Sequence, residues 1–351
     1  MGLNPSFGMK QKTGYMPKKL SWLGVSASLN CSPNNSAAYV MTRPVISDTL
    51  QPFRIDGANI RGRVARLSTS YEGILGTHAY PEPVARILGE TIALAAAIST
   101  SIKFDGVFYL QTQGDGPIPM LVADVTSAGQ MRGYARYNDE VFTGGLEINH
   151  PVPDLLGAGH LAFTLDQGAH TDRYQGIVAL EGNTIAECAQ SYFQQSEQLD
   201  TAIIVAAQPV ADDFPPRAAI IMIQKMPGED RLILTTNEED ENWQNATILL
   251  NSVTSEELLD PRLSLNELLY RLFHEKGVRL YDKKDISYHC RCAREKVAET
   301  LASFSTEDLT DMKTETGEIT ATCEFCHKVY AFNDADLDEI RDHQSLGSST
   351  A

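Results

Sequence analysis

Four cysteines near the C-terminus have the residue type and spacing of a metal or redox site. Cys290 and Cys292 form a C-x-C pair in "YHCRCAREKV", and Cys323 and Cys326 form a C-x-x-C pair about thirty residues later in "ATCEFCHKVY". The chain of 351 residues holds six cysteines in all. Such clustering in a cysteine-poor chain favours a metal or redox site in a reducing compartment over a disulfide framework.

Zinc fits this set of donors, because it takes tetrahedral ligands and prefers thiolate. The stretch "GEITATCEFCHKVYAF" predicts a hairpin with the C-x-x-C pair at its tip, and "REKVAETLASF" predicts a helix directly after the C-x-C pair. The positive end of that helix favours nearby thiolates. Four thiolates close the site to further ligands, which excludes Lewis-acid catalysis. His289 and His327 flank the cysteines and are alternative ligands, although four thiols leave little need for them.

The spacing alone leaves two roles open for such a zinc ion. One role is that of a structural staple. The C-x-C pair favours a redox role instead, since it is rarer in structural zinc ribbons than paired C-x-x-C. It also places two thiolates where an oxidant could join them.

The elements that must hold this site follow a domain with an α+β pattern. Apolar and polar residues alternate around glycines in residues 53–67, which predicts strand structure. Pro81 and Pro83 open a long helix that we expect to end near Lys103. Further strands are predicted at "VFYLQT", "PMLVADV", "RGYARY", "LAFTLDQ", "YQGIVAL", "TAIIVAAQ" and "RAAIIMIQK". We therefore expect a mainly antiparallel sheet core with packed helices, ending near residue 236.

A second helix is predicted over residues 183–199. Asn183 or Thr184 is expected to cap it, because a side-chain oxygen at that position accepts a hydrogen bond from the first turn. Cys188 lies on its apolar face, so we interpret this cysteine as a packed core thiol.

The character of the chain changes after residue 236. An acidic run, "TTNEEDENW", precedes two predicted helices at Glu241–Val253 and Leu263–His274. Apolar residues recur in them at helical spacing: Trp243, Ile248, Leu249, Val253, Leu265, Leu268, Leu269 and Leu272. We favour amphipathic helices packed on the core. The alternative is a metastable linker that leaves the core and presents its apolar face to a partner.

Residues 1–40 differ from the rest, because they contain lysines but no Asp or Glu. Three interpretations compete. The first is an upstream extension with Met41 as the true first residue, the second an organelle transit peptide, and the third a weak secretory signal. None of them gives this segment a part in the fold.

The overall composition argues against two classes of partner. Hydrophobic residues make up 42% of the chain and charged residues 21%, and the net charge is −17. An acidic surface repels nucleic-acid phosphate and anionic lipid, so we expect neither nucleic acid nor membrane as a partner. The longest apolar stretch, residues 91–102, is too short to cross a bilayer.

These motifs resemble those of the heat shock protein 33 family, the redox-regulated holdase chaperones. That family's metal motif is C-x-C, a gap of about thirty residues, then C-x-x-C, and the four cysteines named above fill its places. The upstream domain also resembles the family in "QGDGPIPMLVADV", "RGYAR" and "YQGIVALEGNTIAECAQSYFQQSEQL". The resemblance runs from about Phe53 to the final helix and leaves out residues 1–40.

The resemblance implies a layout and a mechanism. Residues 1–47 are an extension that we expect to be disordered or absent from the mature protein. They precede an α+β chaperone core (48–236), a helical linker (237–285) and a redox-switch zinc-binding domain (286–345). In the reduced, inactive form the four cysteines bind one zinc ion per chain. Oxidation, by peroxide with mild unfolding or by hypochlorous acid, would form disulfides, release zinc and unfold the linker.

The resemblance further implies a chaperone rather than an enzyme. The oxidised protein would bind unfolding client proteins without ATP, in the cytoplasm, and a homodimer of that form is a further expectation. If adjacent cysteines pair, as Cys290–Cys292 and Cys323–Cys326, each small loop stabilises by about 2 kcal/mol, against roughly 10–16 kcal/mol for a structural zinc. The domain should then loosen, whereas a long-range Cys292–Cys323 bond would hold its halves together.

Other functions stay open on the sequence. "CEFC" is compatible with a thiol–disulfide oxidoreductase, although tight zinc binding would block turnover. A nucleic-acid-binding zinc ribbon is a further alternative, and the acidic balance argues against it. The last is a protein whose zinc domain is purely structural.

Overall fold

The computed structural model describes residues 48–168, 173–209, 214–227 and 236–339. The predicted extension over residues 1–47, including Met41, lies outside the described residues. Within them the fold is α+β, as predicted, with mainly antiparallel sheets. No helix among the described residues is long and apolar enough to cross a membrane.

The first sheet has the strand order β10–β1–β2–β9–β8, and β11 also pairs with β1. All of these pairings are antiparallel. Its strands are β1 (Thr49–Ile55), β2 (Ile60–Leu67), β8 (Thr201–Gln208), β9 (Arg217–Lys225), β10 (Val278–Leu280) and β11 (Lys284–Asp285). The strand pattern predicted over residues 53–67 is thus a hairpin of two strands. Its turn contains Gly57, whose φ of +69° favours glycine.

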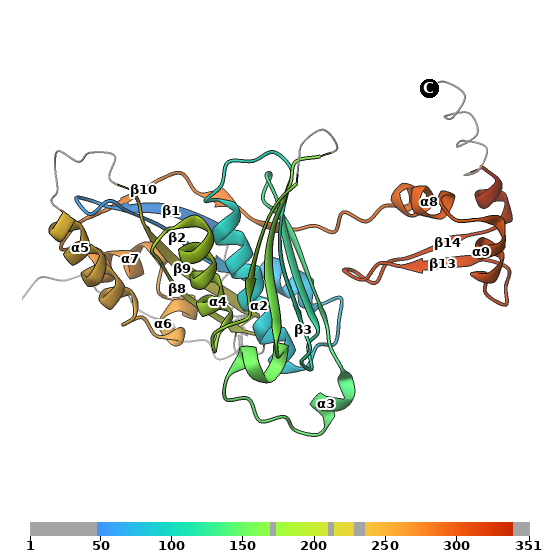
Figure 1. Cartoon of the computed structure of the whole chain (residues 1–351), viewed down its shortest axis with the longest axis horizontal. Coiled ribbons are helices and arrows are strands. Elements are labelled where there is room, and N and C mark those ends of the chain that lie inside the picture. Colours follow the sequence, from blue (N-terminus) through green and yellow to red (C-terminus); the bar gives the residue numbers. More distant parts are fainter. Residues whose placement is uncertain (1–47, 169–172, 210–213, 228–235, 340–351) are drawn as a thin grey trace, which may run out of the picture. The chain divides into compact units, whose positions relative to one another are not determined.

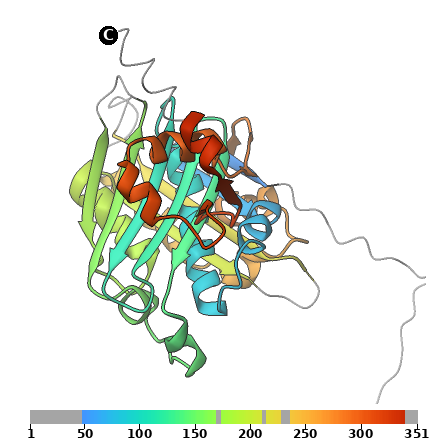
Figure 2. The same ribbon diagram turned by 90° about the vertical axis from the view of Figure 1, so that its right-hand side faces the viewer.

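The second sheet has the order β12–β5–β4–β3–β6–β7, and only the β12–β5 pair in it is parallel among the described strands. Its strands are β3 (Val107–Gly114), β4 (Met120–Thr126), β5 (Gln130–Arg136), β6 (Gly159–Asp166), β7 (Tyr174–Ala179) and β12 (Ser287–Tyr288). In Figure 2 the strands β3 to β7 of this sheet, coloured from teal to yellow-green, lie side by side.

Helix α2 (Glu82–Ser99) is the centre of the main core, because it packs against strands of both sheets (Figure 1). Small residues allow this close approach. A Cβ atom at Gly89 would lie 2.7 Å from the Ala207 Cβ atom and 2.6 Å from the ring of Tyr71. The helix ends earlier than Lys103, because the hydroxyl of Ser99 donates back to the Ala96 carbonyl, as Thr100 and Ser101 do to the next two carbonyls.

Helix α4 (Ile185–Tyr192) continues as a π-helical turn, η2 (Phe193–Glu197), so the predicted helix over residues 183–199 is shorter and irregular at its end. Thr184 caps it, since its hydroxyl accepts a hydrogen bond from the Glu187 N–H at 3.2 Å. Cys188 is fully buried in the main core cluster, which confirms its interpretation as a core thiol. The remaining short elements of the core are α1 (Thr69–Leu75), α3 (Asp139–Thr143) and the π-helical turn η1 (Val152–Leu156).

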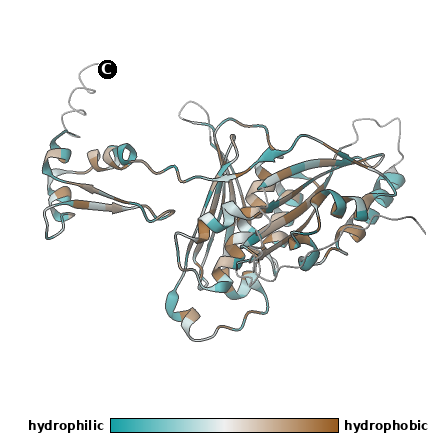
Figure 3. Ribbon diagram, turned by 180° about the vertical axis from the view of Figure 1, so that it is seen from behind, coloured by the Kyte–Doolittle hydropathy of each residue, from teal (hydrophilic) through white to brown (hydrophobic). Residues whose placement is uncertain are grey.

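Three helices, α5 (Thr236–Leu250), α6 (Ser255–Leu259) and α7 (Leu265–Phe273), cover the other face of the first sheet. We call residues 236–273 the linker helices. In Figure 3 they carry both hydrophobic and hydrophilic stretches, as amphipathic helices do. Their packing on the sheet confirms the favoured interpretation for this state. The sequence analysis did not predict α6, and it was wrong about Ile248 and Leu249. These residues are 67% and 41% exposed, while Leu250 is fully buried.

The last elements form a small unit around the cysteines. They are α8 (Arg294–Ala302), α9 (Thr306–Asp311), β13 (Ile319–Thr322) and β14 (Val329–Phe332), followed by helical residues 334–339. Its apolar core consists of Leu301, Leu309, Ile319, Tyr330, Phe332 and Leu337. We call residues 290–339 the cysteine domain. A core of this size is too small to support a stable fold without a further constraint.

Candidate metal centre

The C-x-x-C pair lies at the tip of the β13–β14 hairpin, as predicted. The Cys323 N–H donates to the Lys328 carbonyl at 3.0 Å, and the His327 N–H donates to the Cys323 carbonyl at 2.8 Å. His327 has a φ of 54°, so the chain turns sharply directly after Cys326. This turn points both sulfurs of the pair to one side of the hairpin.

The C-x-C pair lies between a short strand and a helix. Strand β12 ends at Tyr288, and α8 begins at Arg294 with Ala293 as its N-cap residue. Ala293 offers no side-chain cap. The first-turn N–H groups of α8 are therefore left to stabilise negative charge on the sulfurs that precede it.

The four sulfur atoms lie within 4.8 Å of one another and form a cluster suited to a metal ion. Cys290 Sγ lies 3.7 Å from Cys323 Sγ, and Cys292 Sγ lies 3.4 Å from Cys326 Sγ. Zinc–sulfur bonds of about 2.3 Å in a tetrahedron would place neighbouring sulfurs about 3.8 Å apart. The donor set and its spacing therefore fit a tetrahedral thiolate site.

The sulfurs perturb one another's ionisation. Burial raises the pKa of the Cys292 thiol, but hydrogen bonds from Tyr330, at 3.2 Å, and from the other thiols outweigh burial and bring its pKa to about 7. Burial and the hydrogen bond with Cys292 raise the pKa of Cys326 to about 12. The surroundings thus favour a thiolate at Cys292 and oppose one at Cys326, and a divalent cation would remove that opposition.

Neither flanking histidine belongs to the sulfur cluster. His289 is exposed, while the His327 ring lies 3.9 Å from the ring of His78 between centroids. Burial lowers the pKa of His78, and the neighbouring His327 lowers it further. His327 therefore contacts the core of the protein rather than the sulfurs.

The residues between the cysteines contact the outer face of the second sheet, and the sequence analysis did not identify this contact. Arg291, between Cys290 and Cys292, forms a 2.9 Å ion pair with Asp124 of β4. Asp124 also pairs with Arg132 of β5 at 2.8 Å, although its side chain is only 1% exposed. We call Asp124, Arg132 and Arg291 the charge cluster. Burial raises the pKa of Asp124, and Arg132 and Arg291 oppose that rise.

Phe325, between Cys323 and Cys326, makes the equivalent contact for the second pair. The Arg132 guanidinium lies 3.8 Å from the centroid of its ring, a cation–π geometry. The Phe325 carbonyl accepts a hydrogen bond from the Thr77 hydroxyl at 3.2 Å. The Arg132 Nη1 atom also lies 4.0 Å from Cys290 Sγ. Arg132 therefore contacts Cys290 of the first motif, Phe325 of the second motif, and Asp124.

The segment before Cys290 joins the cysteine domain to both sheets. Strands β10 and β11 pair with β1, and β12 pairs with β5. The side chain of Ile286 is 5% exposed and belongs to the main core cluster. Three consecutive strand pairings therefore lie between the linker helices and the cysteine domain along the chain.

The linker helices are held to the first sheet by a buried arginine as well as by apolar contacts. Arg66 of β2 is 4% exposed. Its guanidinium donates to the Leu258 carbonyl at 2.9 and 2.6 Å and to the Leu263 carbonyl at 2.9 Å. Leu258 lies at the C-terminal end of α6, where a helix has unpaired acceptors, and Leu263 lies in the segment between α6 and α7.

Comparison with known proteins gives consistent results. A family model described as Hsp33 protein matches residues 48–333. A 33 kDa chaperonin of Caulobacter vibrioides (strain NA1000 / CB15N) is 39% identical over 290 residues, which cover 82% of this chain and 95% of that protein. A 33 kDa chaperonin of Shewanella loihica is 36% identical over 293 residues, which cover 84% and 95%.

The fold also matches a solved structure. The crystal structure of a 33 kDa chaperonin (heat shock protein 33 homolog) from Thermotoga maritima aligns with a TM-score of 0.72 and 24% sequence identity. The alignment covers 86% of this chain and all of that one, and it supports the fold. Because the family model and the relatives cover most of the sequence, this chain belongs to the Hsp33 protein family of chaperones.

Proposed function

We propose that this protein is a redox-regulated, ATP-independent holdase chaperone, inactive when reduced and active when oxidised. The observation that carries the proposal is the placement of Arg291 and Phe325. Each lies between two cysteines of the sulfur cluster, and each contacts the core sheet. The chemical state of the sulfurs is therefore linked to the docking of the cysteine domain.

In the reduced form, Cys290, Cys292, Cys323 and Cys326 would hold one zinc ion, which suits the all-sulfur donor set and its spacing. When bound, the ion contributes structural stabilisation, roughly 10–16 kcal/mol for a domain of this kind. The small apolar core of the cysteine domain explains why such a constraint is needed. The protein's own part is to keep the thiolates close together and hydrogen-bonded.

Oxidation would convert the four thiolates into two disulfides, Cys290–Cys292 and Cys323–Cys326. The sulfurs lose four electrons, and two molecules of peroxide take them up with four protons to give four waters. Disulfide sulfur is a poor ligand, so the metal is lost. In the reduced arrangement the 3.7 and 3.4 Å sulfur contacts join one cysteine pair to the other. Pairing within each motif requires two sulfurs that now lie within 4.8 Å of each other to close to a bond of about 2.05 Å, which would move Arg291 and Phe325.

Once the cysteine domain leaves the second sheet, the strands β12, β11 and β10 lose their anchor in turn. The linker helices directly precede β10 in the chain. Their release would uncover the apolar outer face of the first sheet, including Ile60, Val64, Ile221 and Ile223, and the inner faces of α5 and α7. Burial of apolar area is non-directional, so such surfaces would bind unfolding client proteins of many sequences.

Other features fit this function. The net charge of −17 would keep a complex with an unfolded client soluble. We place the protein in the cytoplasm, where thiols stay reduced until an oxidant arrives. We propose no catalytic step, no nucleic acid and no membrane as partner. A homodimer of the oxidised form is part of the proposal, and light scattering of the oxidised protein tests it.

The test is the aggregation of a heat-denaturing client protein followed by light scattering. We expect the oxidised protein to suppress aggregation without ATP and the reduced, zinc-loaded protein to leave it unchanged. Equal suppression by both forms would overturn the redox switch and leave the zinc ion as a staple. An insulin-reduction assay separates this function from that of a thiol–disulfide oxidoreductase, because a holdase should not catalyse insulin reduction.

A further inference from the structure

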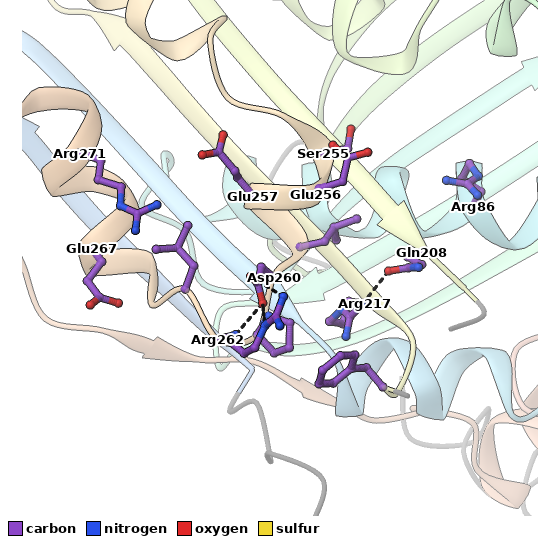
Figure 4. Close-up of a pocket in the computed structure, with 14 residues that line it drawn as sticks. Arg86, Gln208, Arg217, Ser255, Glu256, Glu257, Asp260, Arg262, Glu267 and Arg271 are labelled. Carbon is purple, nitrogen blue, oxygen red and sulfur yellow. Dashed lines mark hydrogen bonds and ion pairs between the residues drawn. The ribbon is translucent and has the colours of Figure 1, made fainter. Parts of the chain in front are cut away.

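A pocket of about 600 Å³ lies between the linker helices and the first sheet (Figure 4). Arg86, Gln208 and Arg217 line it from the core side, and residues 255–257 and 259–263 with Glu267 and Arg271 line it from the linker side. The linker helices and the core therefore form this pocket jointly, and it exists only while the linker helices are packed.

Arg217 is the unusual residue of this pocket. It is 4% exposed, and its Nε and Nη1 atoms find no hydrogen-bond partner. Its Nη2 atom donates to Gln208 Oε1 at 2.7 Å, and its guanidinium lies 4.9 Å from the centroid of the Phe214 ring. A buried cation whose donors are only partly satisfied is costly, and an anion is the group that would satisfy it.

Four acidic residues line the pocket, and three of them, Glu257, Asp260 and Glu267, already accept hydrogen bonds; the fourth is Glu256. Asp260 accepts from the Arg262 N–H at 2.9 Å and from its guanidinium at 2.9 and 3.2 Å. Glu257 and Glu267 accept from the backbone at the starts of α6 and α7, in two capping boxes. Among the described residues Arg217 has no ion pair within 4.0 Å; burial lowers its pKa, and the charge of the nearby Asp260 only partly opposes this. Arg66, also buried, adds a second positive charge beside it.

We propose that this pocket binds a small tetrahedral oxyanion of the phosphate class at Arg217, with Arg271 of α7 supplying positive charge from the linker side. Guanidinium groups recognise phosphate oxygens through directed, charge-assisted hydrogen bonds. A tetrahedral anion has oxygens in several directions, so it can satisfy donors from both sides of the pocket. A planar carboxylate can satisfy fewer of them.

Binding across this pocket would stabilise the packed linker helices. A ligand that binds only the packed form lowers the fraction of open molecules by a factor of 1 + [L]/Kd, about elevenfold at ten times Kd. This consequence deepens the proposed function, because phosphate would oppose release of the linker. The binding itself rests only on the reduced structure.

The test uses the reduced, zinc-loaded full chain and inorganic phosphate. Isothermal titration should show one binding event, and amide hydrogen exchange in α6 and α7 should slow with phosphate but not with chloride at equal ionic strength. Sulfate should act like phosphate and acetate should act weakly. Arg217→Met should lose both effects, while Arg63→Met should keep them. Arg63 is a matched control, because it is a partly buried arginine on the opposite face of the same sheet with an unpartnered Nε atom.

Each outcome decides the matter. Binding that persists in a folded Arg217→Met protein, or no binding by the wild-type protein, overturns the site. If Arg217→Met does not fold, Arg217→Lys takes its place: it keeps the charge but loses the planar donors, and its phosphate affinity should fall at least tenfold. If the reduced protein suppresses aggregation, the proposed function fails, yet the titration still tests the site.

Discussion

Replacing Asp124 by asparagine should loosen the docking of the cysteine domain while leaving the sulfur cluster intact. Asp124 lies between two guanidiniums, at 2.8 Å from Arg132 and 2.9 Å from Arg291, and these retain 16% and 17% exposure. Asparagine keeps the shape of the side chain and removes its charge. The docked state would then hold two nearly buried cations without an anion.

The expected cost follows from this burial. Removing one partner of a buried ion pair costs about 3–5 kcal/mol, and the residual exposure of the arginines places this case near about 3 kcal/mol. Since 1.4 kcal/mol is a factor of ten, the undocked population should rise about a hundredfold. Asp166→Asn is the matched control, because Asp166 forms a 2.8 Å pair with Arg173 that is 70% exposed. An exposed pair contributes about 0–1 kcal/mol.

Two amide groups report this docking directly. The Ser287 N–H donates to the Gly129 carbonyl at 3.0 Å, and the His289 N–H donates to the Met131 carbonyl at 2.9 Å. Their hydrogen exchange should accelerate about a hundredfold in Asp124→Asn, while the Cys323 amide within the hairpin keeps its rate. Zinc content should not change.

The reasoning is refuted if Ser287 and His289 exchange at the wild-type rate in a folded Asp124→Asn protein. It is refuted equally if Asp166→Asn accelerates them to the same extent. Acceleration at Cys323 as well would mean that Asp124 supports the sulfur cluster itself rather than its docking.

Three further predictions concern the core, the linker helices and the metal. Burial raises the pKa of Glu90 to about 7, although the nearby Arg86 opposes the rise. Between the ordinary pKa of 4.5 and this value, the carboxyl group is protonated in the folded state and ionised in the unfolded state. The protein therefore loses about 3 kcal/mol of its free energy of unfolding as the pH rises through that range. Glu90→Gln should remove most of this loss, which a comparison of melting temperatures at about pH 5 and about pH 8 will show. Arg66→Met should leave the Leu258 and Leu263 carbonyls without their hydrogen-bond donor and destabilise the packing of the linker helices by about 2–3 kcal/mol. The reduced variant should then bind more of an apolar dye than the wild-type protein, and Arg63→Met should not. The double variant Cys323→Ser, Cys326→Ser should lower zinc from about one per chain to nearly none in metal analysis, and a normal zinc load would contradict the ligand assignment.

The parts of the site that the sequence predicted are those fixed by local spacing. The C-x-x-C pair must lie at a tight turn, and alternating apolar residues on both sides make that turn a hairpin tip. The residue pattern directly after Cys292 likewise predicted the helix α8. The antiparallel core could be predicted because short alternating strands with glycine and proline between them are a strong local signal.

The charge cluster could not be predicted, because its members lie far apart in the sequence. Asp124 and Arg291 are joined only by the fold, and Asp124 looks like any polar residue on the outer face of a strand. Ile248 and Leu249 were assigned to the wrong face for a local reason. Ile248, Leu249 and Leu250 follow one another, each step turns about 100° around the helix, and periodicity alone cannot choose among them. Helix α6 was too short to show a period, although Thr254 and Glu257 form the capping box that marks its start.

The central claim is that metal, docking and chaperone activity change together on oxidation. It is tested most directly by measuring zinc content and suppression of client aggregation on the same samples, first reduced and then oxidised with peroxide under mild unfolding. The account predicts about one zinc per chain and no suppression when reduced, then no zinc and full suppression without ATP when oxidised. Suppression by the zinc-loaded reduced protein, or an oxidised protein that is active while retaining its zinc, would contradict it.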